Sequence, residues 1–369
     1  MKLIDLSFYH HPTADLPQMV NRFSTSYQYI FEVDRKLEVI PVLNLATNTQ
    51  FTKDGCTFHG FKGTSLVRDP LFGFARKLKK WNPDIVMVHG LVYPEKIIAL
   101  RMVLGHKVKI VVQHHGGLPS KNGIKKFFHR IADSMTDAYF FTSQYNSIPW
   151  QQSQIIHPSK PVLELLEAST FLNPVAKDIA RKTIPMEGNY NFLWVGRLHP
   201  DKDPITVLKA FEKFVLMQPD AQLFMIFQSN DLLNEINELL SGSAALKSAV
   251  QLVGKIDHSE IANWYSAADY FISGSHHEGS GYALIEALAC GLFPVVSSIP
   301  PVIKITNSGE VALLFETGDH EDLFRKLVQL KSMSKPSSDE LISYFQKNLS
   351  FKKIADTLYE HCRLLVEGK

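Results

Sequence analysis

The segment from Tyr270 to Ser297, YFISGSHHEGSGYALIEALACGLFPVVS, decides the predicted fold. The short apolar run Tyr270–Ser273 predicts a buried strand, and the helix-forming run 282–290 predicts a helix that Gly291 ends. Between them, residues 279–281 carry no bulky side chain, so their backbone can approach a ligand closely. A loop that feeds a helix N-terminus favours anions, because free N–H groups and the helix dipole both point at it.

Two carboxylates frame this loop. Glu278 lies in the loop and Glu286 about one turn into the predicted helix, with seven residues between them. Both side chains can therefore face one pocket. The alternative interpretation is a surface glutamate next to an ordinary amphipathic helix. The intervening glycines and the flanking strands favour the pocket.

Length and composition are those of a globular protein with about two domains. The chain has 369 residues, of which 45% are apolar and 21% charged, and it has no run of about 18 apolar residues. Its first residues lack the apolar core of a signal peptide. The three cysteines are scattered and odd in number, which indicates a reducing compartment. We therefore expect a cytoplasmic protein.

Charge is unevenly divided along the chain. Residues 1–150 hold 19 Lys and Arg against 11 Asp and Glu, whereas the remainder holds 20 against 26. Two basic clusters lie at 76–80 and 121–130, and the second is interleaved with Ile124, Phe127 and Phe128. This arrangement suits peripheral contact with an anionic membrane, on its inner face. A solvated helix face is the alternative. Nucleic acid is not expected as a partner, because no motif for it accompanies the charge.

Strands alternate with helical patterns in both halves, which predicts parallel α/β sheets. The expected strands are 84–89, 109–113, 138–142, 191–195, 221–227 and 249–253, and the expected helices include 94–104, 124–134, 203–217 and 350–365. A run rich in proline and polar residues at 172–190 predicts a domain break. We expect a first domain over 1–175, a second over 186–348 and a closing helix over 349–369 that returns to the first.

Ligands bind beyond the carboxyl ends of strands in open parallel sheets, and two such ends carry candidate residues. Gly196 and Arg197 follow one predicted strand, and Lys202 begins the next helix; together the two cations can clamp a pyrophosphate. His114 and His115 follow another strand. Neighbouring side chains on a strand point in opposite directions, so at most one histidine should face a cleft. A hydrogen-bonded pair of structural histidines is the alternative.

Metal binding is not expected. The histidines lack the spacing of a helical metal pair, and no Cys/His quartet occurs. Asp201 and Asp203 flank Lys202 in a short acidic pattern, which we interpret as a helix cap.

The residues assembled so far resemble the family-4 retaining glycosyltransferases, which have the GT-B fold. The resemblance is carried by VGRL at 195–198 with Lys202, VGKIDHSEIANWYSAADYFISGS at 253–275, EGSGYALIEALACG at 278–291, PVVSS at 294–298, LLFETGD at 313–319 and SFKKIADTLYEHC at 350–362. The first half matches weakly. This resemblance implies two Rossmann-like parallel-sheet domains that face each other across a cleft.

The resemblance also implies roles for particular residues. Arg197 and Lys202 would bind the donor diphosphate and stabilise the leaving group. Glu286 would bind the ribose hydroxyls, and Glu278 the hydroxyls of the donor sugar. The other residues implied at the site are Gly196 and Ser280 in its loops, Gly281 and Tyr282 at the sugar and phosphate, Lys255 and Ile256 beside the nucleobase, and His115, or failing it His114, at the sugar.

The implied function is retaining transfer of a sugar from a UDP- or GDP-linked donor to a glycan, glycolipid or other hydroxyl acceptor, in cell-surface polysaccharide or glycolipid biosynthesis. No metal or other cofactor is implied, because fixed cations can stabilise the diphosphate. A non-catalytic subunit of the same fold, which binds sugar nucleotides or acts as a scaffold, remains the alternative, since the loop after the first strand (8–13) lacks the glycines common in the family. A dehydrogenase would need a GxGxxG sequence after a strand, and the chain has none in that setting.

Overall fold

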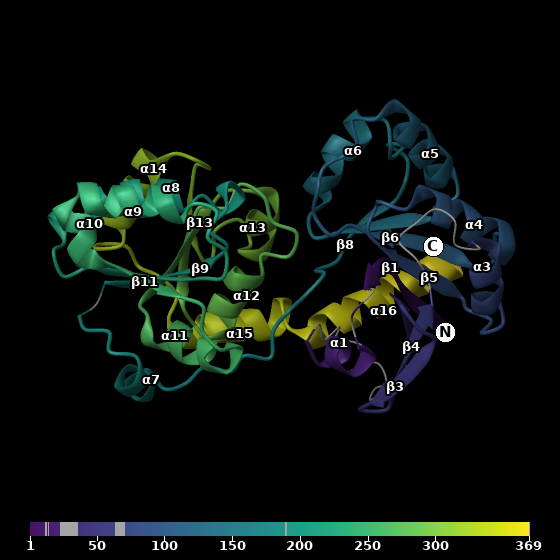
Figure 1. Cartoon of the computed structure of the whole chain (residues 1–369), viewed down its shortest axis with the longest axis horizontal. Coiled ribbons are helices and arrows are strands. Elements are labelled where there is room, and N and C mark those ends of the chain that lie inside the picture. Colours follow the sequence, from purple (N-terminus) through teal and green to yellow (C-terminus); the bar gives the residue numbers. More distant parts are fainter. Residues whose placement is uncertain (12, 14, 23–35, 63–70, 189, 369) are drawn as a thin grey trace. The chain divides into compact units, whose positions relative to one another are not determined.

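The computed structural model of the chain describes residues 1–368 apart from 12, 14, 23–35, 63–70 and 189. The chain divides into two compact units (Figure 1): the first holds Met1–Ala168 and the closing segment from Phe351, and the second holds Ser169–Ser350. The boundary falls before the break predicted at 172–190. Residues 169–175 belong to the second unit, where the Val175 N–H donates to Ser266 Oγ at 3.0 Å.

The first unit is built on an eight-stranded sheet in the order β3-β4-β2-β1-β5-β6-β7-β8. Its strands are β1 (Lys2–His11), β2 (Glu38–Leu45), β3 (Thr49–Lys53), β4 (Cys56–Lys62), β5 (Ile85–His89), β6 (Lys109–Gln113), β7 (Ala138–Phe141) and β8 (Val162–Glu164). All neighbouring pairs are parallel except β3 and β4. These two form a hairpin that the sequence analysis missed. Its two-residue turn, Asp54-Gly55, has positive φ at both residues, as the tight hairpin turn requires.

Helices cover both faces of this sheet (Figure 1). The helices α3 (Leu71–Lys79), α4 (Pro94–Leu104) and α5 (Gly123–Ser134) contribute Leu78, Leu100 and Ala132 to one buried cluster. On the other face, the closing helix α16 (Phe351–Glu367) buries Ile354 and Leu358. Successive residues of β1 enter opposite clusters, because side chains alternate along a strand. The described part of the unit also holds α1 (Leu16–Arg22), α6 (Ile148–Gln152) and the one-turn η1 (Gln144–Ser147).

The second unit has a six-stranded sheet in the order β11-β10-β9-β12-β13-β14, parallel throughout. Its strands are β9 (Asn191–Gly196), β10 (Gln222–Phe227), β11 (Val250–Gly254), β12 (Tyr270–Ser273), β13 (Phe293–Ser297) and β14 (Leu313–Phe315). The chain runs outward from β9 in one direction and then from β12 in the other. The point where the direction reverses lies between β9 and β12, and ligands bind there in open α/β sheets.

Helices lie before, between and after these strands, and two of them are close to the helices predicted at 203–217 and 282–290. The described helices of the unit are α7 (Lys177–Thr183), η2 (Pro200–Lys202), α8 (Pro204–Met217), α9 (Leu233–Gly242), α10 (Ala244–Ala249), η3 (His258–Glu260), α11 (Ile261–Ala267), α12 (Tyr282–Ala289), α13 (Pro300–Ile305), α14 (His320–Gln329) and α15 (Ser338–Asn348). Among the described helices of the chain, none combines the length and apolar character needed to span a membrane.

Candidate functional site

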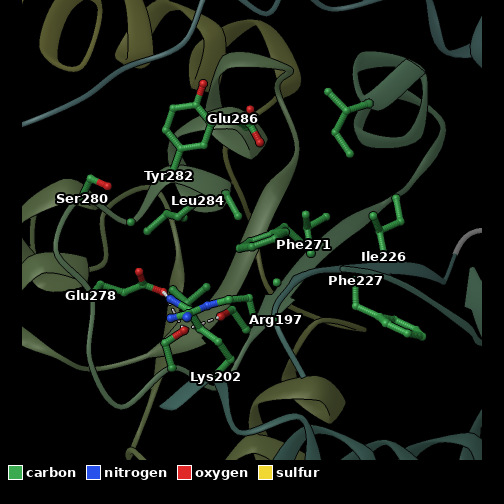
Figure 2. A pocket seen from close by; sticks show the side chains of 18 of the residues that line it. Arg197, Lys202, Ile226, Phe227, Phe271, Glu278, Ser280, Tyr282, Leu284 and Glu286 are labelled. Carbon is green, nitrogen blue, oxygen red and sulfur yellow. Dashed lines mark hydrogen bonds and ion pairs between the residues drawn. The ribbon is translucent and has the colours of Figure 1, made fainter. Parts of the chain in front are cut away.

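A pocket of about 400 Å³ opens in the second unit where β9 and β12 end. Arg197, Lys202, Glu278 and Glu286 all contribute to its lining. Figure 2 shows the two cations beside Glu278 at one end of the pocket, with Glu286 toward the other end. The two cations and the two glutamates selected from the sequence thus line one pocket.

Lys202 and Glu278 form an ion pair although 76 residues separate them in sequence. Lys202 Nζ lies 2.5 Å from Glu278 Oε1, and Ser275 Oγ donates to the same oxygen at 2.7 Å. Less than a fifth of each charged side chain is exposed. The lysine charge is therefore balanced by the glutamate inside the pocket.

The loop before α8 is tied to the loop after β12 by further contacts. The His276 N–H donates to Asp201 O at 2.8 Å, and His276 Nε2 lies 2.9 Å from Asp203 Oδ2. Asp203 Oδ1 accepts from the Thr206 N–H, so Asp203 caps α8 as predicted. These contacts hold the two loops together at the end of the sheet.

Gly274 permits this close approach. A Cβ atom at position 274 would lie 2.9 Å from Asp203 O and 3.3 Å from Val207 Cγ2. Real Cβ atoms essentially never come within 3.0 Å of another atom, so a side chain here would force the loops apart. The glycine that follows β12 therefore allows the two loops to lie close enough for Lys202 to contact Glu278.

Glu286 is almost fully buried on α12 and has one oxygen without a hydrogen-bond partner. Its Oε2 accepts from the Tyr265 hydroxyl at 3.0 Å. Its Oε1 is buried and makes no hydrogen bond, and His258 Nε2 lies 3.6 Å away. Leaving a carboxylate oxygen buried and unsatisfied costs free energy, of the order of 1–3 kcal/mol. A ligand hydroxyl that donates to Oε1 would remove this cost.

The helix that carries Glu286 begins in the pocket. Gly281 precedes α12 with φ +62°, a conformation that glycine adopts readily, and no side chain caps the helix. A Cβ at Gly281 would lie 2.9 Å from Ile305 Cδ1. Ser280, Gly281 and Tyr282 all line the pocket. The first-turn N–H groups of the helix have no partner within it, and its dipole favours an anion.

Part of the pocket wall is apolar. Ile226, Phe227, Phe271 and Leu284 contribute to the lining, and Figure 2 shows Phe271 and Leu284 between the cations and Glu286. Ile256, predicted beside a nucleobase, is among the lining residues. Lys255 is not, so its predicted place in the site is not supported.

The first unit has a separate pocket of about 480 Å³, with His89 and His115 in its lining. His89 Nε2 lies 2.5 Å from Asp5 Oδ1, and His89 Nδ1 lies 2.6 Å from His115 Nε2. His115 Nδ1 then lies 2.6 Å from Glu167 Oε2. Both nitrogens of His115 are therefore engaged, and a sugar hydroxyl would have to displace one of these partners to bond the ring.

His114 is a structural residue. Its ring stacks on Phe141, Nε2 lies 3.3 Å from Gly117 O, and Nδ1 accepts from the Gly116 N–H. Burial lowers its pKa, which favours the neutral ring that these contacts need. The prediction that at most one of the two histidines faces a cleft is confirmed, and the choice of His114 as a site residue is not supported.

Among the described residues, no group of three or more His, Cys, Asp and Glu side chains is placed to hold a metal ion. Sequence reasoning also missed three residues of the second-unit site: Ser275, His258 and Tyr265. Tyr265 and His258 contact Glu286 from an earlier segment of the chain, whereas Ser275 lies three residues from Glu278. The only signal available was that Ser275 follows a strand end.

Comparison with solved structures identifies the fold. Sucrose-phosphate synthase from Thermosynechococcus elongatus superimposes on the chain with a TM-score of 0.73 at 17% identity, covering 100% of both chains. Structural neighbours of this kind are GT-B glycosyltransferases. Together with the two parallel-sheet α/β units, this likeness shows that the protein has the GT-B fold, as the sequence predicted.

The sequence identifies the family. The glycosyl transferases group 1 family matches residues 176–366, more than half of the chain, so the protein belongs to this family. It is 25% identical over 268 residues to GDP-mannose:cellobiosyl-diphosphopolyprenol alpha-mannosyltransferase of Xanthomonas campestris, covering 68% of this chain and 65% of that protein. It is 28% identical over 189 residues to UDP-Gal:alpha-D-GlcNAc-diphosphoundecaprenol alpha-1,3-galactosyltransferase of Escherichia coli, covering 48% of each. The chain thus matches less than two thirds of the length of these relatives.

Proposed function

We propose that the protein is a retaining glycosyltransferase of family 4, and that the second-unit pocket binds a nucleotide-diphosphate sugar. One observation carries the proposal: a single pocket combines Arg197, Lys202 and the start of α12 with the buried, unsatisfied Oε1 of Glu286. The cations and the helix N-terminus suit a diphosphate. The free carboxylate oxygen suits a ribose hydroxyl, and the apolar side chains of the pocket wall suit a nucleobase.

Lys202 has a particular part in this scheme. Its ammonium pairs with Glu278. A bound diphosphate would compete for Lys202 and free Glu278 Oε1 to accept from a hydroxyl of the donor sugar. On donor binding, Lys202 would pair with the phosphate and Glu278 would accept a hydrogen bond from the sugar. Neither side chain would then be left without a polar partner.

The reaction we propose breaks the bond between the anomeric carbon and the diphosphate oxygen and forms a bond from that carbon to the acceptor oxygen. The acceptor attacks on the face that the leaving group vacates, and its proton passes to the departing phosphate oxygen. Arg197 and Lys202 stabilise the charge that develops on the diphosphate, which is electrostatic catalysis. The Glu278–Glu286 pair then serves binding, not hydrolysis, and no metal is required for the step.

The acceptor we propose is a glycan or a lipid-linked sugar, in surface polysaccharide or glycolipid biosynthesis. Two curated relatives support this class, since both are named for sugars carried on a diphosphate-linked polyprenol or undecaprenol. Their named donors are GDP-mannose and UDP-Gal, so we propose a UDP- or GDP-linked donor here.

A thermal-shift screen tests the donor class. The melting temperature is measured against UDP, GDP and other nucleoside diphosphates and then against their sugars, because a ligand of the native state raises it in proportion to the logarithm of its concentration. We expect one nucleotide to stabilise the wild type and to have a much smaller effect on Glu286→Gln. Equal stabilisation of both proteins would contradict the assignment of the pocket.

A non-catalytic sugar-nucleotide-binding subunit is the second candidate. The observation in its favour is that His115 has both ring nitrogens engaged within the first unit. A transferase releases nucleoside diphosphate when donor and a polyprenol-linked acceptor are both present, whereas a binding subunit does not. Measuring this release distinguishes the two candidates. Donor binding without release in any acceptor mixture would favour the binding subunit.

A further inference from the structure

Helix α5 of the first unit has its apolar stripe on the outside. Ile124, Phe127 and Phe128 lie at helical spacing on one side of the helix, and 73%, 60% and 43% of their surfaces are exposed. The buried side instead holds His129, Ala132 and Asp133, two of which are polar. A helix that packs on a domain core normally shows the reverse arrangement.

The inner side of the helix is held by contacts of Asp133 and His129. Asp133 Oδ1 accepts from the Tyr139 hydroxyl at 2.9 Å, and the His129 ring lies edge-on to Trp150. On the flank of the helix, Arg130 donates to Gln154 O and Oε1. The second half of α5 is therefore fixed to the unit in this orientation, and the exposure of the apolar stripe is a consequence of that packing.

The exposed stripe is surrounded by positive charge. We define the α5 patch by its apolar members and its lysines: Leu118, Lys121, Ile124, Lys125, Lys126, Phe127 and Phe128. Leu118, in the preceding loop, is 66% exposed. Within residues 118–134, all of which the structure describes, the one acidic residue is Asp133, and it is buried.

We propose that the α5 patch docks the protein on a bilayer surface that contains anionic lipid, with Leu118, Ile124, Phe127 and Phe128 inserted among the head groups. Interfacial helices combine aromatic and aliphatic side chains with lysines in this way. Lysine is depleted in protein–protein interfaces, which argues against a protein as the occupant. The proposal is independent of the sugar-transfer chemistry proposed for the second unit.

Vesicle sedimentation of the full chain tests the proposal. We expect binding to phosphatidylcholine vesicles that contain phosphatidylglycerol, with little binding to pure phosphatidylcholine and release at high salt. Phe127→Ala combined with Phe128→Ala should lower the bound-to-free ratio about tenfold or more at low salt. The matched control is Leu216→Ala with Met217→Ala at the end of α8, which are 70% and 54% exposed. This control should bind like the wild type.

A second pair of variants isolates the charge. One variant replaces three lysines of the α5 patch by glutamine, Lys121, Lys125 and Lys126. In the control variant, three exposed lysines of the second unit, Lys182, Lys331 and Lys347, are replaced by glutamine. The two variants therefore have the same net charge. We expect the patch variant to lose binding and the control to keep it. Equal loss in both would reduce the effect to net charge and overturn the proposal.

Insertion is read out by fluorescence. The three native cysteines are buried, so a cysteine placed at Ile124 can be labelled with a polarity-sensitive dye. Anionic vesicles should shift its emission to the blue, whereas a dye at Met217 should not respond. Absence of a shift at Ile124, or failure of the wild type to sediment with anionic vesicles at low salt, overturns the proposal and leaves the patch as a surface for a protein partner.

Discussion

His89 and His115 lie ring to ring, with Nδ1 of the first 2.6 Å from Nε2 of the second, and the outer nitrogen of each faces a carboxylate. The contact between the rings needs one proton, and the contacts to Asp5 and Glu167 need one each. Two neutral imidazoles carry only two. The three contacts therefore need a third proton, and the carboxylates of Asp5 and Glu167 favour it on His89.

The stability of the first unit should reflect this shared charge. Burial by itself lowers the pKa of His89, but Asp5 and Glu167 raise it above its usual value of 6.5. A raised pKa stabilises the folded state below the unfolded pKa, and this contribution is lost as pH rises through the folded value. We expect the stability difference between wild type and His89→Gln to shrink as the pH rises above about 6.5. Urea unfolding across pH, with His106→Gln as an exposed control, measures it. A difference that grows with pH would contradict the shared proton.

His129 should show the opposite pH dependence. Burial, with a smaller effect of Lys125, lowers its pKa to about 4. Between that value and the unfolded pKa of about 6.5, the unfolded chain binds more protons, so stability falls as the pH falls. His129→Leu should flatten the dependence over this window in the same unfolding experiment. A slope equal to that of the wild type would show that other groups dominate.

Lys202 should matter for turnover more than for folding. Lys202→Met removes a cation from the proposed diphosphate site, and we expect kcat to fall about 10²- to 10³-fold. Ser275 still donates to Glu278, and the pair is partly exposed, so the free energy of unfolding should fall by only about 1 kcal/mol. Lys209→Met on the exposed side of α8 is the control. Initial rates of nucleotide release are measured for both variants. Equal rates would contradict the assignment of Lys202 to the diphosphate site.

The Glu286 carboxylate should favour donor binding at a cost to the stability of the fold. Glu286→Gln replaces a buried carboxylate that has one unsatisfied oxygen. The unliganded variant should therefore melt at or above the temperature of the wild type, while donor affinity falls about tenfold or more. Calorimetric titration and thermal melting measure the two effects. Glu235→Gln on α9 should change neither, and an unliganded Glu286→Gln that melts much lower would indicate a structural role.

Gly274 should be intolerant of a single methyl group. Gly274→Ala places a Cβ 2.9 Å from Asp203 O, so the loops that carry Lys202 and Glu278 must separate. We expect a loss of about 1–3 kcal/mol in the free energy of unfolding and a marked loss of donor affinity. Gly242→Ala, where a Cβ would meet no atom within 4 Å, is the control. Wild-type behaviour of Gly274→Ala in urea unfolding and donor titration would mean that the loops adjust at little cost.

Local patterns in the sequence predicted two parallel α/β domains, and the family resemblance implied the GT-B fold. Short apolar runs bounded by glycine predicted β12 and its neighbours, and the glycine loop before a helix marked the anion site, because these signals depend on residues near one another in the chain. Arg197, Lys202, Glu278 and Glu286 were found in this way. The hairpin β3–β4 was missed although its Asp54-Gly55 turn was visible.

Which side chains bond to one another, and which face of a helix is buried, depends on contacts between distant segments. The partner of Lys202 lies 76 residues away in the sequence. The two loops come close enough for this contact because Gly274 has no Cβ. His89 and His115 come from the ends of different strands, and the stripe on α5 has the same spacing whether it faces the core or solvent. Periodicity reports that a helix is amphipathic, but the orientation of the stripe depends on the polar contacts that Asp133 and His129 make inside the unit.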